Sequence, residues 1–524
     1  YKLDVVRGFN EICEFFRTNS YDIVKLIEEL FSDVIVRNVI KSTQKYVDML
    51  GYGYHPKCMK DYLEREKLFE NLWGYEYKNK SAVLPEIRDL LVNDVPIFFN
   101  NTSSRDLISI DGAILKNYYS RTAIEHVKER ILGFTEQEYP YQILCLELSL
   151  GIYQLKTENI KIGKSAQNAL DNIIEMIISR AKYDQNRKSV AFEDFIYDAD
   201  GELDYNALNA ELYDGLSGIY LLILFYAQKY TNPRIGLMKE AIENTILKLP
   251  RKSEGYSSPN VYVGKYSILY PLYHKYKLEG EEKDILLAES LLENLEHEID
   301  RNVDGDWLGG VGGLIQVLLN FYKLTKRKVF LEKAELLSNV WEKKEVRLCG
   351  FAHGFSGIIY ASYSLFRETG KQRYLNYTTE YLKRENSYFD GKVWPDLREG
   401  KKATSHWCHG TVGIGLTRLY LLEHGYNDAQ VRKDLMHCIN DAIITTSKES
   451  GLCHGEMGRF IFLKEVQRSK LVAEEYQKQI DRALAEILEK IFSEGAVIGA
   501  FRKDGILGLM TGITGVGYGL LKEL

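Results

Sequence analysis

The residues best suited to chemistry lie in two short motifs in the second half of the chain, Trp-Cys-His-Gly at 407–410 and Leu-Cys-His-Gly at 452–455. They contribute Cys408, His409, Cys453 and His454. Thiolate sulfur and imidazole nitrogen are ligands that zinc prefers in proteins. Because two adjacent residues at the start of a helix rarely both reach one ion, we expect three of these four side chains to bind a zinc ion. The fourth coordination position then stays open, which is typical of catalytic zinc.

An Ala-His-Gly motif at 352–354 has the same form without the thiol. As a general acid or base, His353 could take up the proton of a thiol or deliver a proton to carbon. The alternative interpretation is a structural histidine that is bonded to a neighbouring turn. Asp306 could orient His353 or position a substrate, and it would be equally suited to cap a helix.

These motifs belong to a series of seven turns of small residues. The turns lie at 213–218, 263–267, 308–313, 353–357, 409–413, 454–458 and 511–515. An apolar helical segment follows each turn, and a charged amphipathic segment precedes the next one. A repeat of two helices cannot bury its apolar face alone and must stack on its neighbours. The pattern predicts a mostly α-helical protein with a closed α/α toroid of seven helical pairs, whose turns surround one mouth. An open solenoid is the alternative.

Composition excludes several classes of function. The chain has 524 residues, which favours two or more domains. A formal net charge of -6 and an isoelectric point near 6.0 argue against nucleic acid as a partner. No uninterrupted apolar run of about 18 residues is present, so we expect no membrane span. Seven cysteines in so long a chain indicate a reducing compartment, and we expect the protein in the cytoplasm.

The first 155 residues differ in character from the repeats. Their apolar residues recur at helical spacing, and 36–46 is interpreted as a basic helix. Residues 85–90 and 93–99 are interpreted as a helix end and a turn. A polar stretch at 156–169 is expected to be a linker, so the predicted domains are 1–155 and 170–524.

The turns and the motifs around His353, Cys408 and Cys453 resemble those of the lanthionine synthetase cyclases, across roughly residues 170–524. The resemblance implies that one zinc ion is bound by Cys408, Cys453 and His454. It also implies that His353 is the catalytic acid or base and that Asp306 supports it. Class I cyclases have an arginine four places before the first zinc cysteine, where this chain has Thr404. The resemblance implies the role of that arginine in this chain only if another basic side chain performs it.

The N-terminal part resembles the end of the dehydratase domain of the class II, bifunctional lanthipeptide synthetases. The matching residues are Arg37 and Thr43, followed by His-Pro at 55–56 and Asp-Val-Pro at 94–96. The resemblance implies that Arg37 and Thr43 serve the elimination of phosphate from phosphorylated Ser or Thr. It also implies a kinase-like part upstream of residue 1 that holds ATP and Mg2+, so the chain, which begins at Tyr1, is expected to be a piece of a longer protein.

The residues themselves support this elimination role less directly. A guanidinium is a good partner for a leaving phosphate. On one continuous helix, however, Arg37 and Thr43 would not share a face. In the alternative interpretation, Arg37 forms an ion pair with Asp33, and Thr43 caps a helix or packs against neighbouring side chains.

The expected function is that of a bifunctional lanthipeptide synthetase, which dehydrates Ser and Thr of a precursor peptide and then adds Cys thiols to form thioether rings. The expected partner is a precursor peptide with a leader and a Ser/Thr/Cys-containing core, and the enzyme is expected to be a monomer. Two alternatives are another zinc enzyme that alkylates thiols on an α/α toroid, and a metal-stabilised peptide-binding scaffold without chemistry.

Overall fold

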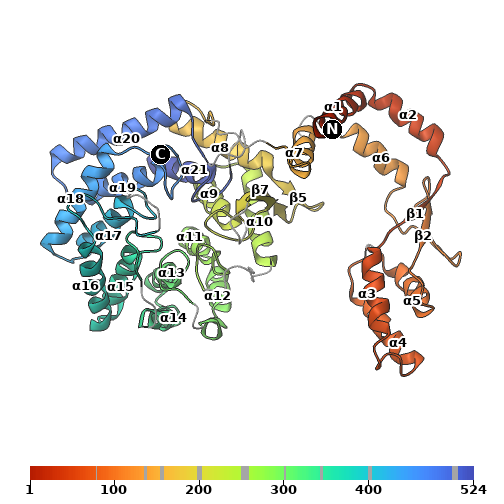
Figure 1. Cartoon of the computed structure of the whole chain (residues 1–524), viewed down its shortest axis with the longest axis horizontal. Coiled ribbons are helices and arrows are strands. Elements are labelled where there is room, and N and C mark those ends of the chain that lie inside the picture. The colour runs from red at the N-terminus through yellow and green to blue at the C-terminus, as the bar shows by residue number, and fades with distance from the viewer. Residues whose placement is uncertain are drawn as a thin grey trace. The chain divides into compact units, whose positions relative to one another are not determined.

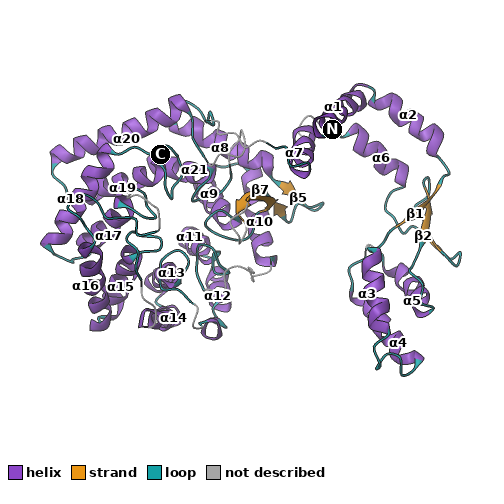
Figure 2. Cartoon of the chain, in the orientation of Figure 1, coloured by secondary structure: helices purple, strands orange, loops and turns teal. Residues whose placement is uncertain are grey.

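The computed structural model describes residues 1–77, 79–134, 138–153, 159–197, 203–249, 259–299, 303–342, 346–398, 404–498 and 506–524. The chain forms two compact units, Tyr1–Gln154 and Leu155–Leu524. Helices predominate in both units (Figure 2). In the described ranges, no helix combines the length and the apolar character needed to cross a bilayer.

The first unit combines helices with a small antiparallel sheet. Its helices are α1 (Lys2–Thr18), α2 (Ser20–Phe31), α3 (Thr43–Gly53), α4 (Tyr62–Phe69), α5 (Val83–Leu91), α6 (Ala123–Leu132) and α7 (Glu138–Ser149), with the 3-10 turns η1 (Glu70–Gly74) and η2 (Lys80–Ala82). The sheet has the order β1 (Ile35–Asn38), β2 (Phe98–Asn101), β3 (Leu107–Ser109) and β4 (Ile114–Leu115). Buried Tyr46, Phe69 and Leu90 join α3, α4 and α5 in one apolar core.

The predicted helix at 36–46 is wrong. Strand β1 occupies its first residues, with Ile35 opposite Asn101 and Asn38 opposite Phe98. Helix α3 begins only at Thr43, after Ser42 accepts a hydrogen bond from the backbone of Lys45. The β-branched residues of β1 suit a strand, but their partner strand lies far along the sequence and leaves no local pattern. The predicted turn at 93–99 likewise runs into strand β2.

The second unit is an α/α toroid, as predicted. The inner helices are α9 (Leu216–Lys229), α11 (Leu269–Glu279), α13 (Val311–Thr325), α15 (Phe355–Thr369), α17 (Thr411–Glu423), α19 (Glu456–Ser469) and α21 (Ile513–Glu523). The outer helices are α8 (Ala166–Arg180), α10 (Pro233–Lys248), α12 (Glu282–Leu291), α14 (Lys328–Ser338), α16 (Gln372–Ser387), α18 (Ala429–Ile444) and α20 (Glu474–Glu494). The remaining elements are η3 (Leu295–Glu298), η4 (Asn339–Glu342), and two hairpins, β5 (Lys182–Tyr183) with β6 (Val190–Ala191) and β7 (Glu193–Tyr197) with β8 (Leu203–Ala207).

Contacts between successive inner helices close the ring. Each inner helix in the described part of this unit packs on the next, and α21 packs back on α9 (Figure 1). Each also packs on one outer helix, and α8, the first of the unit, pairs with α21, the last. Helix α8 begins at Ala166, inside the stretch interpreted as a linker, whose residues 156–158 lie outside the described ranges. Inner helices such as α9 and α13 are apolar on most sides, because neighbouring inner helices and the outer helices bury them.

One residue at the start of each turn, or directly before it, takes part in a ring of hydrogen bonds at the end where the inner helices begin, which we call the mouth. In chain order these residues are Tyr213, Tyr262, Leu308, Ala352, Cys408, Cys453 and Met510. Backbone N–H groups donate from Tyr213 to Tyr262 (2.9 Å), Leu308 to Ala352 (2.9 Å), Ala352 to Cys408 (3.1 Å), Cys408 to Cys453 (3.3 Å), Cys453 to Met510 (2.8 Å) and Met510 to Tyr213 (2.8 Å). The side chain of Asn260 donates to the Gly309 carbonyl and links the remaining pair of turns. The ring holds the turns of successive repeats in register.

Glycine is required where these turns fold back on themselves. Gly410 is the N-cap of α17, and a β-carbon there would lie 2.1 Å from the carbonyl oxygen of Thr404. Gly350 has a φ of 99° and faces the next turn, where a β-carbon would lie 2.7 Å from the carbonyl oxygen of Cys408. The small residues recognised in the sequence therefore allow close approach of backbone to backbone.

Candidate metal centre

The ring of hydrogen bonds places the two thiols together. Cys408 and Cys453 occupy equivalent positions in successive turns, and the backbone N–H of Cys408 donates to the carbonyl of Cys453 at 3.3 Å. His454 follows Cys453 directly and precedes α19 by one residue. The two sulfurs and one imidazole nitrogen all lie within 4.8 Å of one another. The structure thus brings Cys408, Cys453 and His454 into one cluster.

The cluster fits a zinc ion. Zn–S bonds of about 2.3 Å and Zn–N bonds of about 2.0 Å in a tetrahedron place ligand atoms roughly 3.5–3.8 Å apart. Ligand atoms within 4.8 Å of one another can reach that geometry through small side-chain movements. Two thiolates and one imidazole are also a donor set that binds zinc in preference to magnesium or calcium.

The electrostatics of the cluster favour a thiolate at Cys408. A hydrogen bond from Cys453 lowers the pKa of Cys408 to about 4, against the opposing effect of burial, and His454 contributes further. The same hydrogen bond, together with burial, raises the pKa of Cys453. Hydrogen bonds to Cys408 and then to Glu449 raise the pKa of His454 to about 10. A sulfur anion is therefore already stabilised at the position where a cation would bind.

His353 lies in the neighbouring turn, on the side of Cys408 opposite to Cys453. Its Nδ1 is 2.8 Å from Oδ2 of Asp306, so Nε2 stays free of this contact. Burial alone would lower the pKa of His353, but the hydrogen bond and charge of Asp306 raise it overall. Asp306 also accepts a hydrogen bond from the backbone of Gly309 at 2.8 Å, which fixes the carboxylate. The structure thus brings Asp306 into contact with His353.

His409 does not belong to the three-residue cluster. Its ring stacks on that of His353 with the centroids 5.7 Å apart. It is buried, and burial lowers its pKa. In the structure, His409 thus packs against the ring of His353 and lies outside the cluster of candidate metal ligands.

The basic side chain of Arg398 interacts electrostatically with the two thiols of the cluster. Thr404, four places before Cys408, donates a hydrogen bond to the carbonyl of His409 at 2.6 Å. Arg398 is held by buried Asp396 through Nε and Nη2, at 3.0 Å and 2.6 Å. The Asp396 contact raises the pKa of Arg398, and the charges of Cys408 and Cys453 act in the same direction. Arg398 thus contributes positive charge near the two thiols.

Three further residues of the centre were not singled out from the sequence. The hydroxyl of Tyr213 is hydrogen-bonded to Cys453. Glu449 Oε2 lies 2.9 Å from Nε2 of His454. Ser447 donates to the carbonyl of His454 at 3.0 Å. Tyr213 occupies the position in its turn that Cys453 occupies in its own, so alignment of the seven turns is the signal that could have found it. Glu449 and Ser447 carry no comparable signal.

Arg37 and Thr43 lie in the first unit. Arg37 is an exposed residue of β1, and Thr43 is the exposed first residue of α3. The objection that they would lie on different faces of one helix therefore does not apply. Among the described residues, no ion pair joins Arg37 to Asp33, and the N-cap of α3 is Ser42 rather than Thr43.

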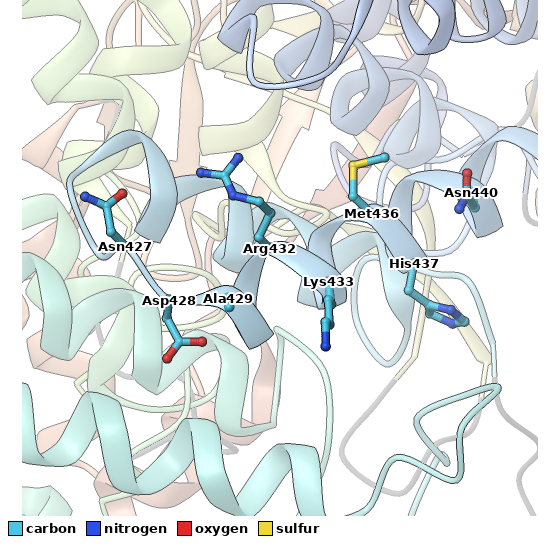
Figure 3. Close-up of a pocket in the computed structure, with 8 residues that line it drawn as sticks. All are labelled: Asn427, Asp428, Ala429, Arg432, Lys433, Met436, His437 and Asn440. Atoms are coloured by element: carbon cyan, nitrogen blue, oxygen red, sulfur yellow. The ribbon is translucent and has the colours of Figure 1, made fainter.

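A separate hollow lies on the outer layer of the toroid. Its lining is Asn427, Asp428, Ala429, Arg432, Lys433, Met436, His437 and Asn440 (Figure 3). These residues come from α18 and the turn before it. The hollow contains none of the predicted site residues.

Both units are similar to known protein families. A family model described as "Lanthionine synthetase C-like protein" matches residues 206–524, and one described as "Domain of unknown function (DUF4135)" matches residues 1–101. The lacticin 481/lactococcin biosynthesis protein LcnDR2 of Lactococcus lactis subsp. lactis is 23% identical over 576 residues. That match covers 100% of this chain and 59% of the relative, so the chain spans less than two thirds of the length of this curated protein.

Among solved structures, a nisin cyclase is 20% identical with a TM-score of 0.45, covering 60% of this chain and 88% of its own. The cellobiose 2-epimerase of Bacillus thermoamylovorans B4167 is 8% identical with a TM-score of 0.35, covering 68% of this chain and 99% of its own. The match over residues 206–524 spans more than half of the chain. The chain belongs to the lanthionine synthetase C-like family, and its two-part organisation is that of the class II lanthipeptide synthetases.

Proposed function

We propose that the toroid is a zinc-dependent lanthionine cyclase. Its substrate is a precursor peptide in which Ser or Thr has already been dehydrated, and its product is a lanthionine or methyllanthionine thioether ring. The observation that carries the proposal is the cluster of Cys408, Cys453 and His454, with ligand atoms within 4.8 Å of one another at the mouth of the toroid. Three protein ligands leave one position open for a substrate sulfur.

The bonds formed and broken balance without a further reactant. The substrate thiol loses its proton, and its sulfur forms a bond to the β-carbon of the dehydroamino acid. The electron pair of the broken C=C π bond moves toward the carbonyl, and the α-carbon then takes up one proton. A bound zinc ion would keep the substrate sulfur as a thiolate at neutral pH.

His353 is the proposed proton carrier. Asp306 engages Nδ1 at 2.8 Å, so Nε2 is the nitrogen that can exchange a proton with the substrate. The carboxylate also stabilises the protonated ring, which suits a group that delivers a proton to carbon. Stacking on His409 limits rotation of the ring. The proposed role of Asp306 is to hold His353 in one orientation.

Replacing Cys408 tests the cyclase proposal. In Cys408→Ala, we expect less than stoichiometric zinc and loss of thioether formation from a dehydrated, Cys-containing peptide, measured by metal analysis and mass spectrometry. Cys58→Ala removes a free thiol of the first unit and should change neither readout. Normal zinc content with normal ring formation in Cys408→Ala would refute the proposal. Zinc binding without ring formation in the unaltered protein would favour a peptide-binding scaffold.

We also infer that the first unit takes part in dehydration of Ser and Thr through phosphorylation and elimination of phosphate. Two features support this. Arg37 is exposed on β1 and forms no ion pair among the described residues. Since β1 ends before α3 begins, Arg37 and Thr43 do not lie on one helix and need not face opposite sides of it. The guanidinium would hold the leaving phosphate, and Thr43 would act beside it. ATP and Mg2+ belong, in this proposal, to a kinase-like part outside the chain.

Arg37→Ala in the full-length protein tests the elimination role. Phosphorylated peptide should accumulate, because phosphoryl transfer continues while the loss of phosphate slows. Mass spectrometry distinguishes the phosphorylated from the dehydrated peptide. Arg7→Ala, at an exposed site on α1, is the matched control. Complete dehydration by Arg37→Ala would contradict the proposal.

The proposed partner is a precursor peptide with a leader and a core that contains Ser, Thr and Cys. We propose that the enzyme acts as a monomer in the cytoplasm, where substrate thiols remain reduced. We further propose, from the pattern of Arg37, Thr43, 55–56 and 94–96, that the full-length protein is a cytolysin-type synthetase, so a cytolysin-type precursor is the first substrate to test.

A further inference from the structure

A carboxylate contacts one ring nitrogen of the histidine in the candidate metal centre. Glu449 Oε2 lies 2.9 Å from Nε2 of His454, and their side chains are 40% and 35% exposed. An ionised carboxylate only accepts hydrogen bonds, so Nε2 must carry the hydrogen in this contact. The other ring nitrogen, Nδ1, is then the one left to face the two sulfurs.

The contact is built into the local backbone. The Ser447 hydroxyl accepts a hydrogen bond from the backbone N–H of Glu449 at 3.2 Å and donates to the carbonyl of His454 at 3.0 Å. Ser447 is itself anchored, because its N–H donates to Glu456 at 2.8 Å and its carbonyl accepts from Lys490 at 2.9 Å. One hydroxyl therefore fixes both residues of the carboxylate–imidazole pair.

We propose that Glu449 is a positioning residue for the metal: it selects the His454 tautomer with hydrogen on Nε2, so that Nδ1 becomes the ligand atom, and its charge strengthens the imidazole as a donor. This inference rests on the proposed zinc site. Carboxylates that bond the outer nitrogen of a ligand histidine generally set its tautomer and raise its basicity.

Glu449 is not a fourth ligand. In the part of the chain that the structure describes, the cluster with metal-ligand spacing consists of Cys408, Cys453 and His454 and does not include it. Its carboxylate contacts Nε2 of His454, the nitrogen that this proposal leaves off the metal. The open position therefore stays available to a substrate.

The two histidine–carboxylate pairs at the mouth use opposite nitrogens. Asp306 engages Nδ1 of His353, whereas Glu449 engages Nε2 of His454. Nε2 of His353 is thus left for proton transfer, and Nδ1 of His454 is left for the metal. The choice of nitrogen in each pair separates the two roles.

The charge of Glu449 also affects the sulfur that would attack. Two thiolates already offset the charge of a divalent ion, and a nearby carboxylate adds further negative potential. With this negative charge beside the site, a bound zinc ion would withdraw less electron density from a substrate sulfur. Glu449 thus favours a substrate thiolate that remains nucleophilic.

Zinc affinity tests the proposal without relying on catalysis. In a competition with a chromophoric chelator, Glu449→Ala should bind zinc about 10–100-fold more weakly than the unaltered protein. Glu449→Gln should lose less affinity, because its amide oxygen still accepts from Nε2–H while the charge is gone. Glu296→Gln, which alters an exposed carboxylate paired with Lys333, should match the unaltered protein.

Two further measurements identify the ligand atom. A crystal structure of the zinc-loaded protein should show Nδ1 of His454 on the metal and Glu449 on Nε2. With cobalt(II) in place of zinc, the thiolate-to-metal absorption bands should shift in Glu449→Gln and stay unchanged in Glu296→Gln. Ligation through Nε2, or equal zinc affinity of Glu449→Ala and the unaltered protein, would overturn the inference.

The outcomes separate this inference from the cyclase proposal. If the unaltered protein binds no zinc, the zinc site itself fails. If it binds zinc and forms rings while Glu449→Ala keeps full affinity, only the role of Glu449 fails.

Discussion

At the scale of single residues, each reactive group of the candidate centre depends on one neighbour. Cys408 has a hydrogen bond from Cys453, His353 has Asp306, and His454 has Glu449. The types of the reactive residues could be predicted from the sequence. Of their partners, Cys453 and Asp306 were predicted, because they lie in or next to the repeated turns, whereas Glu449 was not.

A pH profile should reveal the effect of Asp306 on His353. Asp306 raises the pKa of His353, so Asp306→Asn, which keeps the shape and removes the charge, should lower that pKa. If protonated His353 delivers the proton to carbon, activity is lost as pH rises through its pKa. The alkaline limb of the rate profile should therefore move to lower pH in Asp306→Asn.

The comparison needs His353→Asn as a reference. That variant should lose about 10²–10⁴-fold in the rate of ring formation and lack the limb altogether. Zinc content should stay stoichiometric in both variants, because neither residue belongs to the ligand cluster. An alkaline limb at the same pH in Asp306→Asn and in the unaltered protein would exclude His353 as the titrating group.

At the scale of elements, the glycine turns join each repeat to the next. Their spacing predicted the inner helices correctly, because a turn followed by an apolar segment is a local signal. The same reasoning failed for 36–46, where strand β1 needs β2 as its partner. Short strands that are paired over a long sequence separation leave only a weak local pattern.

Gly350 provides a test of how these turns support the metal centre. Its φ of 99° and the 2.7 Å approach to the Cys408 carbonyl mean that Gly350→Ala introduces both strain and a clash. Gly391→Ala is the matched control, since Gly391 has a φ of 95° and nothing within 4 Å of an added β-carbon.

Denaturant unfolding of the two variants should give different results. Gly391→Ala should lower the free energy of unfolding by about 1–2 kcal/mol through strain alone. Gly350→Ala should lower it by about 1–3 kcal/mol more, because the clash forces the Cys408 turn to move. Only Gly350→Ala should also weaken zinc binding. Equal losses of stability in both variants would show that the contact between the turns contributes nothing.

At the scale of the whole molecule, the toroid closes by pairing its first helix with its last. Helix α8 packs on α21, and α21 packs on α9, so both ends of the unit take part in one ring. The candidate metal ligands come from two neighbouring repeats, and a bound ion would link the turns before α17 and α19. Metal binding should therefore stabilise the folded toroid.

Calorimetry of the whole chain should show this linkage. At free zinc about 100-fold above the dissociation constant, the folded state gains about 2.7 kcal/mol, and the melting temperature of the toroid should rise. Chelator should reverse the rise. Cys408→Ala should melt at the same temperature with and without zinc, whereas Cys58→Ala should respond as the unaltered protein does. A zinc-dependent rise that persists in Cys408→Ala would place the bound ion elsewhere.

The sequence by itself determined the repeat, the positions of the turns, and the thiol and imidazole groups that the turns carry. These features are local, because glycine spacing and helical periodicity act within a single repeat. Only the tertiary structure decided which nitrogen of each histidine meets a carboxylate, which cysteine is favoured as the thiolate, and how β1 pairs. Those properties depend on distances between atoms of different turns or of distant segments, which the closed ring and the sheet establish after folding.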